Sequence, residues 1–286
     1  MKIGAHESGA GALATAFELA KEDGAESLQI FTRSSRQWAA KPLAQADIDG
    51  WKAAWALSDI GPNDVMIHTS YLINLCAPDE ENRVKSVAAF TDEIVRSEQL
   101  GVRWLNTHPG AVKEQSESWG CVEVAATVDR CLEASGAVNT MVVIENTAGQ
   151  GSNIGYRFEH LRDIIGASRY PDRIAVCIDT CHAFAGGYDL GSAEACEEML
   201  QQLKQTVGWD KVAAFHLNGS MGGLGNRKDR HDQIGVGGIT AEAFAHLVNH
   251  PAFANTPAML ETPPLESGER SFRTNLDRLK AMRRPS

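Results

Sequence analysis

The feature that most constrains the fold is a regular alternation of short apolar runs with longer amphipathic segments. The runs are rich in β-branched residues, as buried strands are, and the segments between them have helical periodicity. Eight such units within 286 residues predict an α/β protein that forms a (β/α)8 TIM barrel. The expected strands are Lys2–His6, Ser27–Phe31, Val65–His68, Trp104–His108, Met141–Glu145, Ile174–Asp179, Val212–His216 and Ala258–Glu261.

An open, doubly wound sheet is the structural alternative to a barrel. Such a sheet more often carries a glycine-rich fingerprint after an early strand, and the sequence has none. No linker, low-complexity tract or shift in composition divides the chain. We therefore expect residues 1–286 to form a single domain, with the active site at the C-terminal mouth of the barrel.

Charge and cysteine content narrow the class of protein. The formal net charge of −10 argues against a general polyanion binder, so any affinity for nucleic acid must come from a local patch or from bound cations. The first residues lack the layout of a secretion signal, and no apolar run is long enough to span a membrane. The six cysteines form no C-x-x-C pair, which favours reduced thiols in a cytoplasmic protein.

The third to the eighth of the expected strands each end on a histidine or an acid. These ends are His68, His108, Glu145, Asp179, His216 and Glu261, spaced 34 to 45 residues apart. Because parallel strands of a barrel all end at one mouth, the six side chains should converge there. His182, Asp229 and His231 follow in the adjoining loops. We leave out His160, His246 and His250, which fall in expected helices away from strand ends.

Nine ionisable groups cannot share one pocket unpaired, because desolvation and like-charge repulsion would be too costly. Bound divalent cations resolve this conflict. A ligand set of nitrogen and oxygen without cysteine suits Zn²⁺, with Mn²⁺ or Fe²⁺ as alternatives. Three divalent ions would outweigh the four carboxylates and attract phosphate, so hydrolysis of a phosphodiester is the natural reaction.

Other residues are ambiguous when taken alone. His6 lies at the tip of the first expected strand. It fits a loop residue that only forms hydrogen bonds as well as it fits an active-site residue. Arg36 fits a solvated loop or a contact with phosphate and bases, and Tyr71 with Leu72 fits a small packing cluster or a wedge between bases.

Several segments together resemble one family. They are HTSYLINL, THPG, IENTAGQGSN, VCIDTCHAFAGGYDL, FHLN, DRH and LET. This set is similar to endonuclease IV, the apurinic/apyrimidinic (AP) endonuclease family of base-excision repair, and the resemblance covers nearly the whole chain. It implies a zinc-dependent AP endonuclease (deoxyribonuclease IV type), which is expected to be a monomer that acts on double-stranded DNA and not at a membrane.

The resemblance also implies roles for individual residues. His68 and His108 would hold one zinc, with Glu145 bridging to a second zinc that Asp179, His216 and Glu261 complete. His182, Asp229 and His231 would hold a third. Arg36, Tyr71, Leu72 and Arg230 would contact DNA that is bent and has the damaged nucleotide flipped out.

The chemistry of the family follows in the same way. Its members cut 5′ to an abasic site by attack of metal-bound hydroxide, which leaves a 3′-hydroxyl and a 5′-deoxyribose phosphate. Glu145 and Glu261 would be the catalytic residues that orient this attack. A side activity as a 3′-repair phosphodiesterase or phosphatase on 3′-blocked ends is also expected.

The sequence departs from the family's usual pattern at positions near the ligands. These are Thr69, Gly219, Met221, Asp232 and Val236, and they put metal affinity and lesion preference in question. Two alternatives from other classes remain. A sugar isomerase or epimerase would use fewer metals, and a silent DNA-lesion binder would bind without cleavage.

Overall fold

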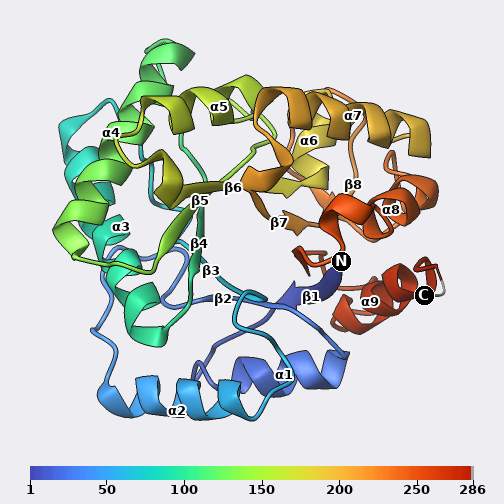
Figure 1. The fold of residues 1–286 in the computed structure, drawn as a ribbon, viewed down its shortest axis with the longest axis horizontal. Helices are drawn as coiled ribbons and strands as arrows, with labels where there is room; N and C mark the ends of the chain where they lie inside the picture. Colours follow the sequence, from blue (N-terminus) through green and yellow to red (C-terminus); the bar gives the residue numbers. More distant parts are fainter. Residues whose placement is uncertain (285–286) are drawn as a thin grey trace.

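The computed structural model describes residues 1–284. Strands and α-helices alternate along most of the described chain (Figure 1). The strands are β1 Lys2–His6, β2 Leu28–Phe31, β3 Val65–His68, β4 Trp104–Thr107, β5 Met141–Glu145, β6 Ile174–Asp179, β7 Val212–His216, β8 Gly219–Ser220, β9 His231–Asp232 and β10 Pro257–Leu260. The α-helices are α1 Thr15–Asp23, α2 Gln45–Ala56, α3 Glu80–Leu100, α4 Glu117–Ser135, α5 Phe158–Ala167, α6 Thr180–Gly186, α7 Ala193–Thr206, α8 Ala241–Val248 and α9 Phe272–Ala281. Short 3-10 turns η1 Pro171–Arg173, η2 Trp209–Lys211 and η3 Pro251–Phe253 lead into β6, β7 and β10.

Eight parallel strands close into a barrel in the order β1-β10-β7-β6-β5-β4-β3-β2. Figure 1 shows the strands at the centre with helices arranged around them. The predicted TIM barrel is therefore confirmed. The strand bounds agree with the prediction to within one residue, and His108 and Glu261 lie just beyond β4 and β10 instead of inside them.

The strand sequences are mostly apolar because both faces of each strand are buried, one under the helices and the other inside the barrel. One core cluster fills the layer between barrel and helices, and a smaller one fills the barrel interior with Met66, Val143, Cys177 and Met259 among its members. β1 passes so close to Ser27, the residue before β2, that Gly4 is required, since a Cβ there would lie 1.7 Å from the carbonyl oxygen of Ser27.

Local signals define the ends of the long helices. The Asp79 side chain accepts a hydrogen bond from the Asn82 N–H at the start of α3, which ends at Gly101 with a φ of 74°. The Ser116 side chain accepts one from Trp119 at the start of α4. Within residues 1–284 no helix is both long and apolar enough to cross a membrane.

One element was not predicted from the sequence. β8 and β9 form a small antiparallel pair in the long connection after β7, with Ser220 opposite His231. The strands are only two residues long, too short for a periodic pattern to reveal them. Their pairing folds the Asp229–His231 segment back over the barrel mouth.

Candidate metal centre

The nine side chains predicted as metal ligands gather at the C-terminal mouth of the barrel. His68, Glu145, Asp179 and His216 are the last residues of β3, β5, β6 and β7. Closure of the barrel brings these strand ends together. The potential ligand atoms fall into three groups, each with its atoms within 4.8 Å of one another: His68, His108 and Glu145; Glu145, Asp179, His216 and Glu261; and His182, Asp229 and His231.

Glu145 belongs to two of these groups and is fully buried. Its Oε2 lies 3.4 Å from the Nε2 atoms of both His68 and His108. Its Oε1 lies 3.1 Å from the Nδ1 of His216. The two oxygens of one carboxylate therefore face two different ligand groups, as a bridge between two cations requires.

The second group surrounds His216 Nδ1. This nitrogen lies 3.5 Å from Glu261 Oε2 and 3.8 Å from Asp179 Oδ2. Two ligand atoms bound to one tetrahedral zinc at about 2.0 Å would be about 3.3 Å apart. The spacing in the group is therefore close to what a small divalent cation needs.

The third group has unused ligand atoms. The Nε2 atoms of His182 and His231 each lie 3.2 Å from a carboxylate oxygen of Asp229. Both nitrogens are buried, yet within residues 1–284 neither makes a hydrogen bond. Because unpaired buried polar atoms are costly, these two nitrogens fit a site that holds a cation.

Hydrogen bonds on the far side of the rings determine which nitrogen faces the centre. For three histidines the Nδ1 contacts a backbone carbonyl, which only accepts, so in the neutral ring Nδ1 carries the proton and Nε2 keeps its lone pair. The contacts are His68 to the oxygen of Thr69 at 2.7 Å, His182 to that of Asn146 at 2.9 Å and His231 to that of Glu261 at 3.1 Å. His216 is reversed, with its Nε2 2.9 Å from Gln29 Oε1 and its Nδ1 facing the carboxylates.

The electrostatics of the centre also favour cations. Burial by itself raises the pKa of Glu145, but His216 and His108 outweigh it and hold that pKa well below its ordinary value. Burial lowers the pKa of His182, but Asp179 and Asp229 raise it well above the usual range. The ionised carboxylates are therefore stabilised by nearby positive charge, which protonated imidazoles or divalent cations can supply.

Sequence reasoning missed the polar residues that hold the ligands in place. Asn106 Nδ2 donates to Glu145 Oε2, and Asn218 Nδ2 donates to Asp179 Oδ2 at 2.7 Å. Their position two residues from a ligand in sequence is a signal that could have identified them. Gln29, which also contacts predicted ligands, is not close in sequence to any of them. His6, which the sequence left ambiguous, places Nδ1 2.8 Å from Glu261 Oε1.

The residues predicted to contact DNA are at the same mouth or exposed on its loops. Tyr71 is 53% exposed and packs its ring edge against those of Phe31 and His68. The Tyr71 N–H donates to the carbonyl of Ser35, which joins its loop to the one that carries exposed Arg36. Leu72 is half-buried and Arg230 is exposed.

The five departures from the family pattern have distinct surroundings. Buried Thr69 donates to the hydroxyl of Thr107, and Asp232 accepts from the N–H of Gln233. At Gly219 a Cβ would lie 2.3 Å from the Gln233 carbonyl oxygen, so this backbone leaves no room for a side chain. Met221 and Val236 are 67% and 44% exposed.

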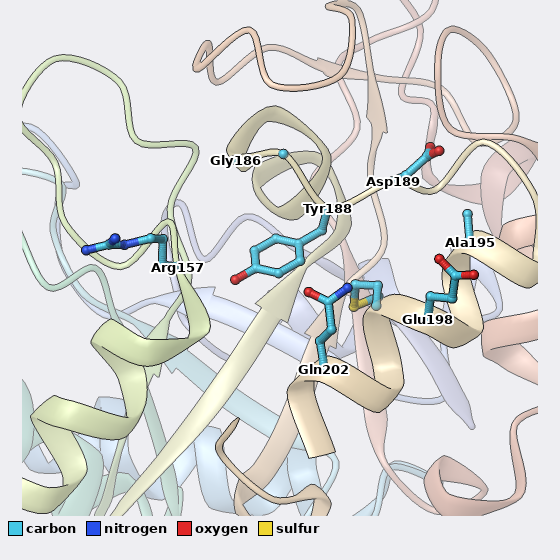
Figure 2. A pocket seen from close by; sticks show the side chains of 9 residues that line it. Arg157, Gly186, Tyr188, Asp189, Ala195, Glu198 and Gln202 are labelled. Carbon is cyan, nitrogen blue, oxygen red and sulfur yellow. The ribbon is translucent and has the colours of Figure 1, made fainter. Parts of the chain in front are cut away.

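Two other features lie apart from the nine ligands. His246 and His250 both point Nε2 at Glu197 Oε2, at 2.7 and 3.5 Å. His250 is not inside a helix as expected; it caps η3, where its Nδ1 accepts the Ala252 N–H, so its Nε2 carries a proton toward Glu197. A hollow of about 250 Å³ beside Tyr188 lies between Arg157 and α7 (Figure 2).

Comparisons with known proteins agree with this geometry. The family model described as "Xylose isomerase-like TIM barrel" matches residues 17–282. The chain is 44% identical over 262 residues to "Probable endonuclease 4" of Chloroflexus aurantiacus, covering 92% of this chain and 91% of that one. It is 41% identical over 261 residues to the protein of the same name from Trichlorobacter lovleyi, covering 91% and 92% of the two chains. The crystal structure of endonuclease IV from Thermus thermophilus superposes with a TM-score of 0.86 at 32% identity, covering 99% and 98%.

A closed parallel barrel with clusters of side chains at its mouth that could hold metal ions defines a TIM barrel of the xylose isomerase-like class. Within that class, the chain belongs to the endonuclease IV family, whose members are DNA-cleaving phosphodiester hydrolases. The resemblance seen in the sequence is thereby confirmed. The structure of a D-tagatose 3-epimerase-like protein matches with a TM-score of 0.73 at 16% identity, which shows a shared fold alone.

Proposed function

We infer that this protein is a zinc-dependent AP endonuclease of base-excision repair that holds three Zn²⁺. It would hydrolyse the bond 5′ to an abasic site in double-stranded DNA, leaving a 3′-hydroxyl and a 5′-deoxyribose phosphate, and would also repair 3′-blocked ends. One observation carries the proposal: nine ligand side chains form three groups, and four histidine rings are hydrogen-bonded so that a lone pair points inward. The proposal includes a monomer in the cytoplasm, with residues 1–286 as one domain.

The proposed ligand assignment follows the three groups. Glu145 would bridge the first two cations, since its oxygens face His68 and His108 on one side and His216 on the other. Nitrogen and oxygen ligands suit Zn²⁺, with Mn²⁺ or Fe²⁺ as alternatives at one site. When bound, the cations supply Lewis acidity toward the scissile phosphate and a nucleophile from water at neutral pH.

The protein's own residues would bind and orient the substrate. Glu145 and Glu261 hold their carboxylates at the centre of the mouth and would fix the direction of attack on phosphorus. Tyr71 and Leu72 would fill the space left by the flipped nucleotide, because an exposed aromatic–aliphatic pair can wedge between base steps. Exposed Arg36 would fill this space together with them, and exposed Arg230 would also contact the DNA.

A duplex with a single tetrahydrofuran abasic analogue tests the proposal directly. This analogue cannot undergo β-elimination, so a product with a 3′-hydroxyl must come from hydrolysis. We expect incision by the protein as purified, loss after chelation, recovery with Zn²⁺ and loss in Glu261→Gln. Metal analysis of the active protein should give three zinc ions per chain.

The matched control is Glu266→Gln, which removes an exposed carboxylate five residues away in the same loop region. It should incise at the wild-type rate. Absence of incision by wild type under zinc, manganese and cobalt would refute the proposed activity. Incision that survives complete chelation would refute the metal dependence.

A further inference from the structure

Gln29 is a buried amide inside the barrel that contacts two of the proposed metal ligands at once. It lies on β2, is fully buried, and pairs in register with His6 of β1. Its Nε2 donates to Glu261 Oε1 at 2.8 Å, and its Oε1 lies 2.9 Å from His216 Nε2. Each end of one amide therefore contacts a different ligand.

The orientation of this amide is determined by its partners. Turned over, it would place its oxygen against the carboxylate of Glu261. That contact would be repulsive in a buried site, so Glu261 fixes the orientation and directs Oε1 at His216. In that orientation His216 Nε2 is a donor, so in the neutral ring Nδ1 keeps the lone pair, and this nitrogen faces Glu145 and Glu261.

His6 acts on the same carboxylate. Its Nδ1 lies 2.8 Å from Glu261 Oε1 and 2.9 Å from Gln29 Nε2, because both nitrogens converge on that one oxygen. The His6 ring packs against Phe31 with 4.3 Å between ring centroids, which fixes its position. With two nitrogens on Oε1, only Oε2 of Glu261 remains directed at His216 Nδ1, 3.5 Å away.

We propose that Gln29 and His6 are positioning residues of the metal centre: Gln29 selects the His216 nitrogen that faces the cations, and both residues select the Glu261 oxygen that does so. The proposal deepens the proposed function and rests on cation binding at this centre. A glutamine suits the position because it offers a donor and an acceptor at opposite edges of one group. Glutamate would repel Glu261, and an apolar residue would leave the His216 N–H unpaired.

Variants at the two positions separate the two roles. Gln29→Met has similar volume and no hydrogen bonds to either ligand. Gln29→Glu keeps the acceptor for His216 but places a charge against Glu261, whereas His6→Gln keeps an N–H donor near Glu261. Gln201→Met is the matched control, because Gln201 lies on outer helix α7 and its Nε2 donates to Glu197.

The measurements are zinc affinity by chelator competition, the imidazole nitrogen NMR signals of His216, and kcat and KM on the abasic duplex. In Gln29→Met we expect one of the zinc-binding steps to weaken by about 10- to 100-fold, which is the usual effect of losing an outer hydrogen bond to a ligand. His216 should lose its single tautomer, and kcat should fall with KM unchanged. Gln29→Glu should keep the tautomer and still bind zinc more weakly, and His6→Gln should retain most of the affinity.

Unchanged zinc affinity and an unchanged His216 tautomer in Gln29→Met would overturn the proposal. If Gln29→Met does not fold, the zinc affinity of Gln29→Glu decides, and wild-type affinity in that variant would overturn the proposal. Failure of the proposed function gives a different result. In that case wild type binds zinc but does not cut the abasic duplex, while the effect of Gln29→Met on zinc binding persists.

Discussion

Glu7 is a buried carboxyl group whose ionisation should make the stability of the fold depend on pH. It follows β1 and is 2% exposed, with Oε1 buried and without a hydrogen bond inside residues 1–284. Its Oε2 accepts from Arg270, which also pairs with Asp23. Burial raises the pKa of Glu7, Arg270 lowers it and the carboxylate of Asp23 raises it again, to about 8.

The sign and size of the effect follow from that value. The ordinary pKa is 4.5, so between pH 4.5 and about 8 the folded state retains a proton that the unfolded chain has released. The contribution of Glu7 to stability therefore falls as pH rises through this range and is constant on either side of it. Since one pKa unit corresponds to about 1.4 kcal/mol, the full loss is at most about 5 kcal/mol.

Glu7→Gln isolates this contribution, because glutamine keeps an oxygen for Arg270 and does not ionise. We expect urea denaturation at a series of pH values from 4 to 9 to show that wild type loses stability relative to the variant as pH rises. Both proteins should be in the same zinc buffer, since zinc affinity itself changes with pH. Glu266→Gln is the control and should parallel wild type. Parallel curves for wild type and Glu7→Gln would refute the reasoning.

Three further predictions concern the mouth of the barrel. Chelation should lower the melting temperature in calorimetry, because the four buried or half-buried carboxylates lose their counter-charge, and added zinc should restore it; an unchanged melting temperature would count against cation binding. Asn106→Leu should weaken zinc binding by about 10-fold or more, measured by chelator competition, because Glu145 loses a hydrogen-bond donor; full affinity would show that this contact is unimportant. Met221→Lys should leave stability within about 0.5 kcal/mol, because Met221 is 67% exposed. If that side chain faces the DNA, the slope of log affinity against log salt should steepen by about one, and an unchanged slope would place Met221 off the interface.

The sequence was most informative where backbone topology decides the outcome. The strand ends could be located because apolar runs stop at them, and a barrel brings such ends together whatever the loops do. This is why His68, Glu145 and Asp179 could be grouped although they are far apart in the chain. Gln29 could not be found in this way. Its partners Glu261 and His216 are 232 and 187 residues away, and a glutamine within an apolar run gives no periodic signal.

His6 and the β8–β9 pair were beyond prediction for related reasons. The role of His6 depends on a single side-chain contact with Glu261, 255 residues away, and a tip histidine alone does not reveal its partner. The β8–β9 pair contains too few residues for strand propensity to act on. Contacts between individual side chains and pairings of very short strands could therefore be found only in the structure.

The backbone carbonyls that orient three of the histidine rings make the centre tolerant of substitutions at the residues that supply those carbonyls. A carbonyl oxygen is present whichever amino acid occupies the position, so substitutions at residues 69 and 146 keep the acceptors for His68 and His182 as long as the chain path is unchanged. Threonine can stand at position 69 for this reason. His216 is different, because a side chain orients it, and a single codon change at Gln29 would remove that support. Among the four histidines whose rings are oriented by hydrogen bonds, substitutions of the orienting residue should therefore affect His216 most.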